Sequence, residues 1–135
     1  MRVFATPPSL EELAALADRA LDWMASRFPA PLAPQLQGLH IIVEDLPDEE
    51  TLAELGLESP YELTGLYRGT SLLHASLAES GAEPPMVILY REPILLEWIE
   101  DGHDLYRLVR NVLVHEIAHH FGFSDAEIAA LEAEG

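Results

Sequence analysis

The stretch VLVHEIAHHFGFSD, residues 112–125, is the part of the chain around which the fold is predicted to form. Apolar residues recur through it, and before it from Leu105 onward, at the three- and four-residue spacing of an amphipathic helix. Because a helix turns once every 3.6 residues or so, His115 and His119 lie one turn apart on one face. Glu116 lies about 100° round the helix from His115, so its carboxylate projects beside the space between the imidazoles.

The spacing H-E-x-x-H is typical of zinc hydrolases, in which the two histidines bind the metal and the glutamate takes a proton from a zinc-bound water. A catalytic zinc usually has a third protein ligand. Gly122 can end the helix in a left-handed conformation and reverse the chain. Asp125 follows three residues later. We therefore predict one zinc ion bound by His115, His119 and Asp125, with Glu116 as the general base.

The residues after the helix allow two further interpretations. The segment SDAE, residues 124–127, is also a capping box that can begin a last helix reaching Glu134, with Asp125 at its positive end. Both roles of Asp125 are compatible with each other. Glu127 or Glu132 on that helix is the alternative third ligand.

The composition restricts the classes of protein to which the chain can belong. With 135 residues, 49% of them hydrophobic, the chain is predicted to form a single domain over residues 1–135. The 24 acidic residues against 7 basic ones give a net charge of −17, which argues against nucleic acid or an anionic membrane as a partner. Cysteine is absent, which excludes disulfides and thiolate ligands. No signal peptide or membrane span is evident, so we expect a cytoplasmic protein.

The pattern of the remaining residues predicts an α+β fold. We expect a capped amphipathic helix from about Leu10 to Phe28 and short helices over residues 48–55 and 94–100, followed by the helix that carries the motif from about Asp104. Strands are predicted over residues 38–44, 63–69 and 86–90. These would form a small sheet of about three strands packed on the active-site helix, with the N-terminal helix on the other side or end. Met86–Tyr90 is the expected edge strand beside the metal, where an extended peptide substrate can hydrogen bond.

Other polar residues are candidates for supporting roles. Tyr67, Tyr90 and His103 are the groups available to stabilise an oxyanion, although a structural role is favoured for each, since tyrosines commonly serve packing with a bonded hydroxyl. Asn111 lies one turn before His115 on nearly the same face and can hydrogen bond near the site. His120 projects away from His119 by about 100° and is expected either to support the metal ligands or to lie at the surface.

Three segments of the chain together resemble a known family. GLYRG at residues 65–69, MVILYR at 86–91 and the block from His115 to Asp125 are similar, in that order, to the zincin metallopeptidases. More narrowly, the chain from about residue 38 onward resembles the small bacterial mini-zincin family of metallopeptidases. The resemblance implies a minimal zincin-like fold, with the same zinc ligands and general base that the spacing predicts. The larger metzincin clan adds a methionine turn after the motif, whereas the methionines here are at positions 1, 24 and 86.

We accordingly predict a zinc-dependent metallopeptidase, in which Glu116 activates a zinc-bound water to hydrolyse a peptide bond. Two alternatives remain. A zinc hydrolase of a non-peptide amide or ester would need the same metal and base. A non-catalytic zinc-bearing binding or regulatory module would need the metal but not Glu116.

Overall fold

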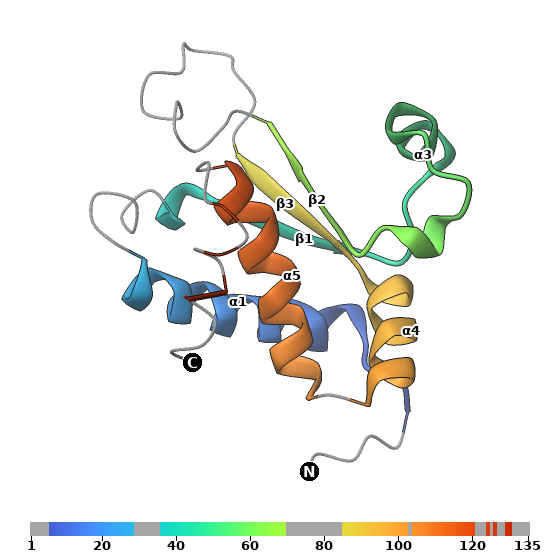
Figure 1. Cartoon of the computed structure of the whole chain (residues 1–135). Helices are drawn as coiled ribbons and strands as arrows, with labels where there is room; N and C mark the ends of the chain where they lie inside the picture. Colours follow the sequence, from blue (N-terminus) through green and yellow to red (C-terminus); the bar gives the residue numbers. More distant parts are fainter. Residues whose placement is uncertain are drawn as a thin grey trace.

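The computed structural model describes residues 6–28, 36–69, 85–102 and 104–120, together with the single positions 124, 126, 129 and 130. Apart from two alanines, the predicted last helix over residues 127–134 lies outside them. The predicted α+β class is confirmed (Figure 1). The elements in chain order are α1 (Leu10–Arg27), η1 (Leu36–Gly38), β1 (His40–Glu44), α3 (Glu49–Leu55), η2 (Pro60–Glu62), β2 (Gly65–Arg68), β3 (Met86–Tyr90), α4 (Arg91–Asp101) and α5 (Leu105–His120).

Helix α1 begins where the sequence predicts. The Ser9 hydroxyl accepts a hydrogen bond from the Glu12 amide at 3.1 Å, and the Glu12 carboxylate accepts one from the Ser9 amide at 3.3 Å. This capping box satisfies two amide groups that would otherwise lack partners in the first turn. The predicted apolar stripe from Leu13 to Met24 is buried.

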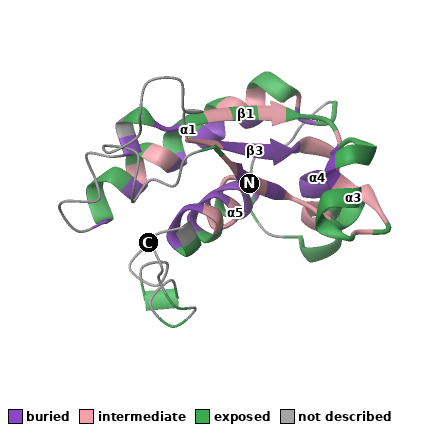
Figure 2. Cartoon of the chain, turned by 90° about the horizontal axis from the view of Figure 1, so that it is seen from above, coloured by how far each residue is buried: buried purple, intermediate pink, exposed green. Residues whose placement is uncertain are grey.

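The three strands form a mixed sheet in the order β1-β3-β2. Strand β3 is parallel to β1, with Ile42 opposite Ile88, and antiparallel to β2, with Leu66 also opposite Ile88. The prediction that Met86–Tyr90 is the edge strand is therefore wrong, because β3 is the central strand (Figure 2). Its uninterrupted apolar run is typical of a strand that is paired on both sides and buried. The strand beside α5 with an open edge among the described residues is β2.

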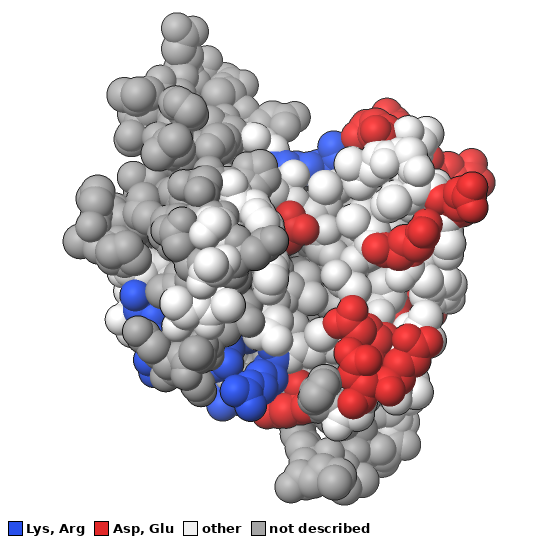
Figure 3. Space-filling view, in the orientation of Figure 1, with Lys and Arg blue, Asp and Glu red and all other residues white. Residues whose placement is uncertain are grey.

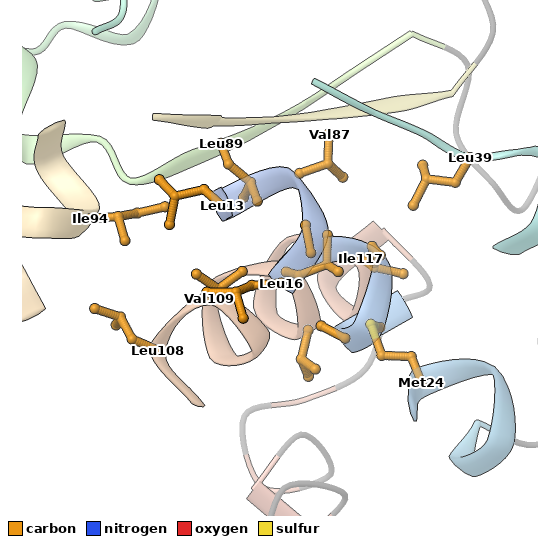
Figure 4. Packing of buried hydrophobic residues seen from close by; sticks show 14 of the residues in the cluster. Leu13, Leu16, Met24, Leu39, Val87, Leu89, Ile94, Leu108, Val109 and Ile117 are labelled. Carbon is orange, nitrogen blue, oxygen red and sulfur yellow. The ribbon is translucent and has the colours of Figure 1, made fainter. Parts of the chain in front are cut away.

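Helices α1 and α5 pack against each other and cover one face of the sheet, α1 over β1 and α5 over β2 and β3 (Figure 1). The N-terminal helix thus shares a face with the active-site helix instead of lying on the opposite side. One hydrophobic core runs between these layers (Figure 4). Leu13 and Met24 of α1, Val87 and Leu89 of β3, and Ile117 of α5 all point into it.

Helix α4 begins directly after β3, three residues earlier than predicted, and ends at Gly102. That glycine has a φ of 69°, a left-handed conformation that reverses the chain toward α5. The reversal lays α4 beside the first turns of α5. Among the described residues, no helix combines the length and apolar character needed to cross a membrane.

Candidate metal and catalytic site

Helix α5 presents the motif at the border between the core and the surface. The face that includes Leu113, Val114 and Ile117 is fully buried against the sheet and α1. His115 and His119 are exposed, and Glu116 is half-buried between the two environments. The amphipathic pattern therefore orients the two imidazoles toward solvent and the carboxylate toward the sheet.

The two histidine rings are neighbours on the exposed face of α5, one helical turn apart. Their centroids are 6.1 Å apart and the ring planes are inclined by 45°. In a tetrahedral site with zinc–nitrogen bonds of about 2 Å, two imidazole ring centres lie roughly 5 Å apart, so a shared ion requires the two rings to rotate about 1 Å closer together. The structure brings together the two residues that the spacing selects, and neutral imidazoles are suitable zinc ligands.

The remaining predicted ligands lie outside the described residues. Asp125, the alternatives Glu127 and Glu132, and Gly122 at the predicted chain reversal all belong to that part of the chain. Within the described ranges, no group of three or more His, Asp or Glu side chains could hold a metal ion. The donor set that the structure assembles is thus the pair of imidazoles on α5, and Asp125 stays a prediction.

Glu116 lies in an environment that stabilises its protonated form. Burial raises its pKa, and this effect outweighs two opposing ones, the charge of His119 and a hydrogen bond from the backbone amide of Tyr67. The Tyr67 amide holds the Glu116 carboxylate next to β2. A half-buried carboxylate that is positioned by a backbone donor and has a raised pKa is suited to accepting and returning a proton.

Close packing of β2 on α5 makes this hydrogen bond possible. A Cβ atom on Gly65 would lie 2.7 Å from Cγ1 of Val112 and 3.5 Å from Cγ of Glu116. The first distance is shorter than van der Waals contact, so only glycine allows the strand to lie this near the helix.

The hydrogen-bond pattern shows which backbone groups β2 leaves open. The Tyr90 amide donates to the Thr64 carbonyl at 2.9 Å. Because bonded pairs alternate along an antiparallel ladder, Leu66 also faces β3, whereas the polar groups of Gly65 and Tyr67 face the outer edge. The Tyr67 amide on this edge is the donor to Glu116. The open edge beside the proposed base therefore belongs to β2.

A pocket of about 530 Å³ begins at Glu116 and follows α5 toward its N-terminus. Its walls are Thr64 before β2, Glu97 and Asp101 of α4, and the face of α5 from Arg107 to Glu116. The volume is in the range of small-ligand sites. His115 also contributes to the wall, so the pocket is continuous with the metal-binding face.

The two tyrosines proposed to stabilise an oxyanion do not line this pocket. Tyr67 is 7% exposed and its side chain belongs to the hydrophobic core. Tyr90 is 2% exposed and lines a different pocket with Thr51 and Arg68. Burial, followed by the charge of Glu44, raises the pKa of Tyr90. His103 and the side chain of His120 lie outside the described residues.

Asn111 lines the pocket one turn before His115, where helical periodicity places it. Sequence reasoning missed four other wall residues: Thr64, Glu97, Asp101 and Arg107. For Arg107 a signal was present, because it lies one turn before Asn111 and about 80° round α5 from His115. Glu97 and Asp101 reach the pocket only through the packing of α4 beside α5, which no local pattern predicts.

Comparison with known proteins supports the same chemistry. A family model described as a zincin-like metallopeptidase matches residues 36–134, from the turn before β1 through the metal motif. A search of curated proteins finds no significant match. The matched region contains all three strands, α4, α5 and the pocket between them.

Proposed function

This chain belongs to the zincin-like metallopeptidase family, and on that premise we propose that it hydrolyses peptide bonds with one zinc ion bound by His115, His119 and Asp125. The observation that carries the proposal is the half-buried Glu116, which lies beside two imidazoles one helical turn apart and beside the open edge of β2. A metal site with a purely structural role would not need a carboxylate there.

Glu116 is the general base of the proposed reaction. A bound zinc ion would supply Lewis acidity, which acidifies a coordinated water and polarises the scissile carbonyl. Glu116 accepts the proton of the attacking water on a carboxylate oxygen and later donates it to the leaving nitrogen. Burial favours the intermediate protonated form of this carboxyl, and the Tyr67 amide restrains its orientation between the two transfers.

We place the peptide substrate along the outer edge of β2 instead of along Met86–Tyr90. An extended peptide can hydrogen bond to an open strand edge, and specificity then depends on the pockets that its side chains enter. Gly65 and Tyr67 direct their polar groups to this edge next to Glu116. The pocket begins at Thr64, immediately before the strand, and can receive the substrate on that side of the scissile bond.

The experiment combines metal analysis with peptide cleavage. Purified wild type and the Asp125→Ala variant are compared for zinc content by elemental analysis. Wild type and Glu116→Gln are incubated with a mixed peptide library, and the products are identified by mass spectrometry. Glu100→Gln, which removes an exposed carboxylate on α4, is the matched control.

We expect about one zinc ion per wild-type chain, weaker retention in Asp125→Ala, and cleavage by wild type and Glu100→Gln but not by Glu116→Gln. Stoichiometric zinc without cleavage of any library member would reject the peptidase. It would leave a non-peptide amide or ester, or a binding role, as the function to test. A chain that binds no zinc under any loading condition would exclude the metal site itself.

A further inference from the structure

Most of the described basic side chains of this acidic chain have a hydrogen-bond, ion-pair or aromatic partner. All seven are arginines, and five of the six described ones have partners. Arg68 pairs with Glu54 at 3.1 Å, and Arg91 bonds to the Pro8 carbonyl at 2.6 Å and to Asp45 at 3.2 Å. Three others lie over aromatic rings: Arg19 over Tyr106 at 4.0 Å, Arg110 over Trp23 at 4.3 Å and Arg27 over Trp23 at 5.3 Å.

Arg107 is the exception among the described arginines. It is exposed and forms no hydrogen bond, ion pair or ring contact with the described residues, although it lines the pocket that begins at Glu116. The pocket also contains Glu97 and Asp101, but neither carboxylate lies within the 4.0 Å of an ion pair with Arg107. Arg107 therefore has no carboxylate partner among the described residues, although the chain contains 24 acidic residues. Its guanidinium is available to a ligand that enters the pocket.

The charges on the opposite wall do not neutralise Arg107. Acidic side chains gather over α4 and α3 on the right of Figure 3. Burial raises the pKa of Glu97, and the nearby charges of Asp101 and Glu100 raise it further. These carboxylates therefore repel one another, and they also disfavour an anion on the α4 side. A ligand carboxylate in this pocket is favoured only along the α5 wall, where Arg107 lies.

The position of Arg107 sets its reach along a bound peptide. It precedes His115 by eight residues, which places the two Cα atoms about 12 Å apart along the helix. An extended peptide advances about 3.3 Å per residue, and the arginine side chain can shorten or lengthen the span by several ångströms. A carboxylate that contacts Arg107 would thus lie about two to four residues from the scissile bond.

We infer that Arg107 is a specificity residue, which binds a carboxylate of the peptide substrate about two to four residues from the cleaved bond. This inference rests on the proposed peptidase function. The carboxylate has two possible sources with the same chemistry, an aspartate or glutamate side chain and the free C-terminus of a short peptide. Binding to either would lower KM and leave kcat nearly unchanged, because the contact is remote from the reacting atoms.

The test uses matched peptides and two readouts. One peptide sequence is made with a free or an amidated C-terminus, and a second series moves a single aspartate, or asparagine as its control, along the chain. KM and kcat are measured with zinc-loaded wild type, Arg107→Gln and the control Arg27→Gln, whose arginine on α1 does not line the pocket. Affinity for the intact peptides is measured separately by fluorescence anisotropy with Glu116→Gln, alone and combined with Arg107→Gln.

We expect the carboxylate to improve KM and affinity about five- to tenfold, and Arg107→Gln to abolish that preference while Arg27→Gln retains it. The thermal midpoint of Arg107→Gln should match wild type, because the exposed side chain has no hydrogen bond or ion pair to lose in the described part of the chain. Cleavage without any carboxylate preference would overturn this inference and leave the peptidase standing. Carboxylate-dependent binding through Arg107 without cleavage would reject the peptidase and the role of Arg107 in cleavage specificity, and would keep only the carboxylate contact. The absence of both binding and cleavage would reject both proposals.

Discussion

The backbone amide of Tyr67 donates a hydrogen bond to the carboxylate of Glu116, which links the outer edge of β2 to the proposed general base on α5. The two residues are 49 positions apart in the chain. Their contact depends on Gly65, where the strand lies against Val112 and Glu116 with no side chain between them. The base is thus oriented by a strand edge, and the position of that edge depends on a glycine.

Gly65→Ala should disrupt this arrangement. The added methyl group would lie 2.7 Å from Cγ1 of Val112, a β-branched side chain with little freedom to rotate in a helix. We expect a loss of about 1–3 kcal/mol of unfolding free energy, measured by urea denaturation, and impaired cleavage. Val112→Ala in the same chain should recover part of the loss. Gly38→Ala, where no atom lies within 4 Å of the new Cβ, is the control and should change little.

Zinc should stabilise the folded chain through its ligands. A ligand at a hundredfold excess over its Kd adds about 2.7 kcal/mol of stability, which corresponds to a rise in Tm on the order of 10 °C. Calorimetry with zinc and after chelation should show this difference in wild type. His119→Ala should remove most of it, whereas His40→Ala, on the exposed face of β1, should retain it. Equal zinc responses in the two variants would argue against His119 as a ligand.

Glu97 should make stability depend on pH in a defined direction. Burial, followed by the charges of Asp101 and Glu100, raises its pKa in the folded chain. Folding therefore favours its protonated form, and the associated stability is present below the unfolded pKa of about 4.3 and lost as pH rises through the higher folded pKa. We expect Glu97→Gln to exceed wild type in Tm at pH 7 and to approach it near pH 4. A constant difference between the two proteins across this range would contradict the assignment.

Arg110 and Trp23 should be energetically coupled. Arg110 is 5% exposed, its guanidinium lies 4.3 Å from the Trp23 ring, and its Nε has no hydrogen-bond partner in the described part of the chain. We expect Trp23→Leu to destabilise wild type by more than it destabilises Arg110→Met, with a coupling of about 1–2 kcal/mol in a double-mutant cycle. Arg110→Met alone should change stability little, because it removes an incompletely paired buried cation. Additive effects would exclude a ring–cation contribution.

Much of the secondary structure was predictable because its signals are local. The capping box at Ser9 and the apolar period of α1 and α5 reside within a few turns of sequence, and both helices begin close to where they were predicted. The position of α4 was less well predicted: its first turn includes Arg91 and Glu92 before Pro93. Proline is compatible with the first turn of a helix, so it does not by itself indicate the starting residue.

By itself, the sequence determined the spacing of His115, Glu116 and His119, because a helix converts residue separation directly into direction and distance. Only the tertiary structure decided which strand borders them, since an apolar run such as Met86–Tyr90 does not reveal its neighbours in the sheet. It also decided that the Tyr67 amide reaches Glu116 and that Arg107 lines a pocket with no ion-pair partner among the described residues. These contacts join segments distant in the chain, and they depend on how the layers pack.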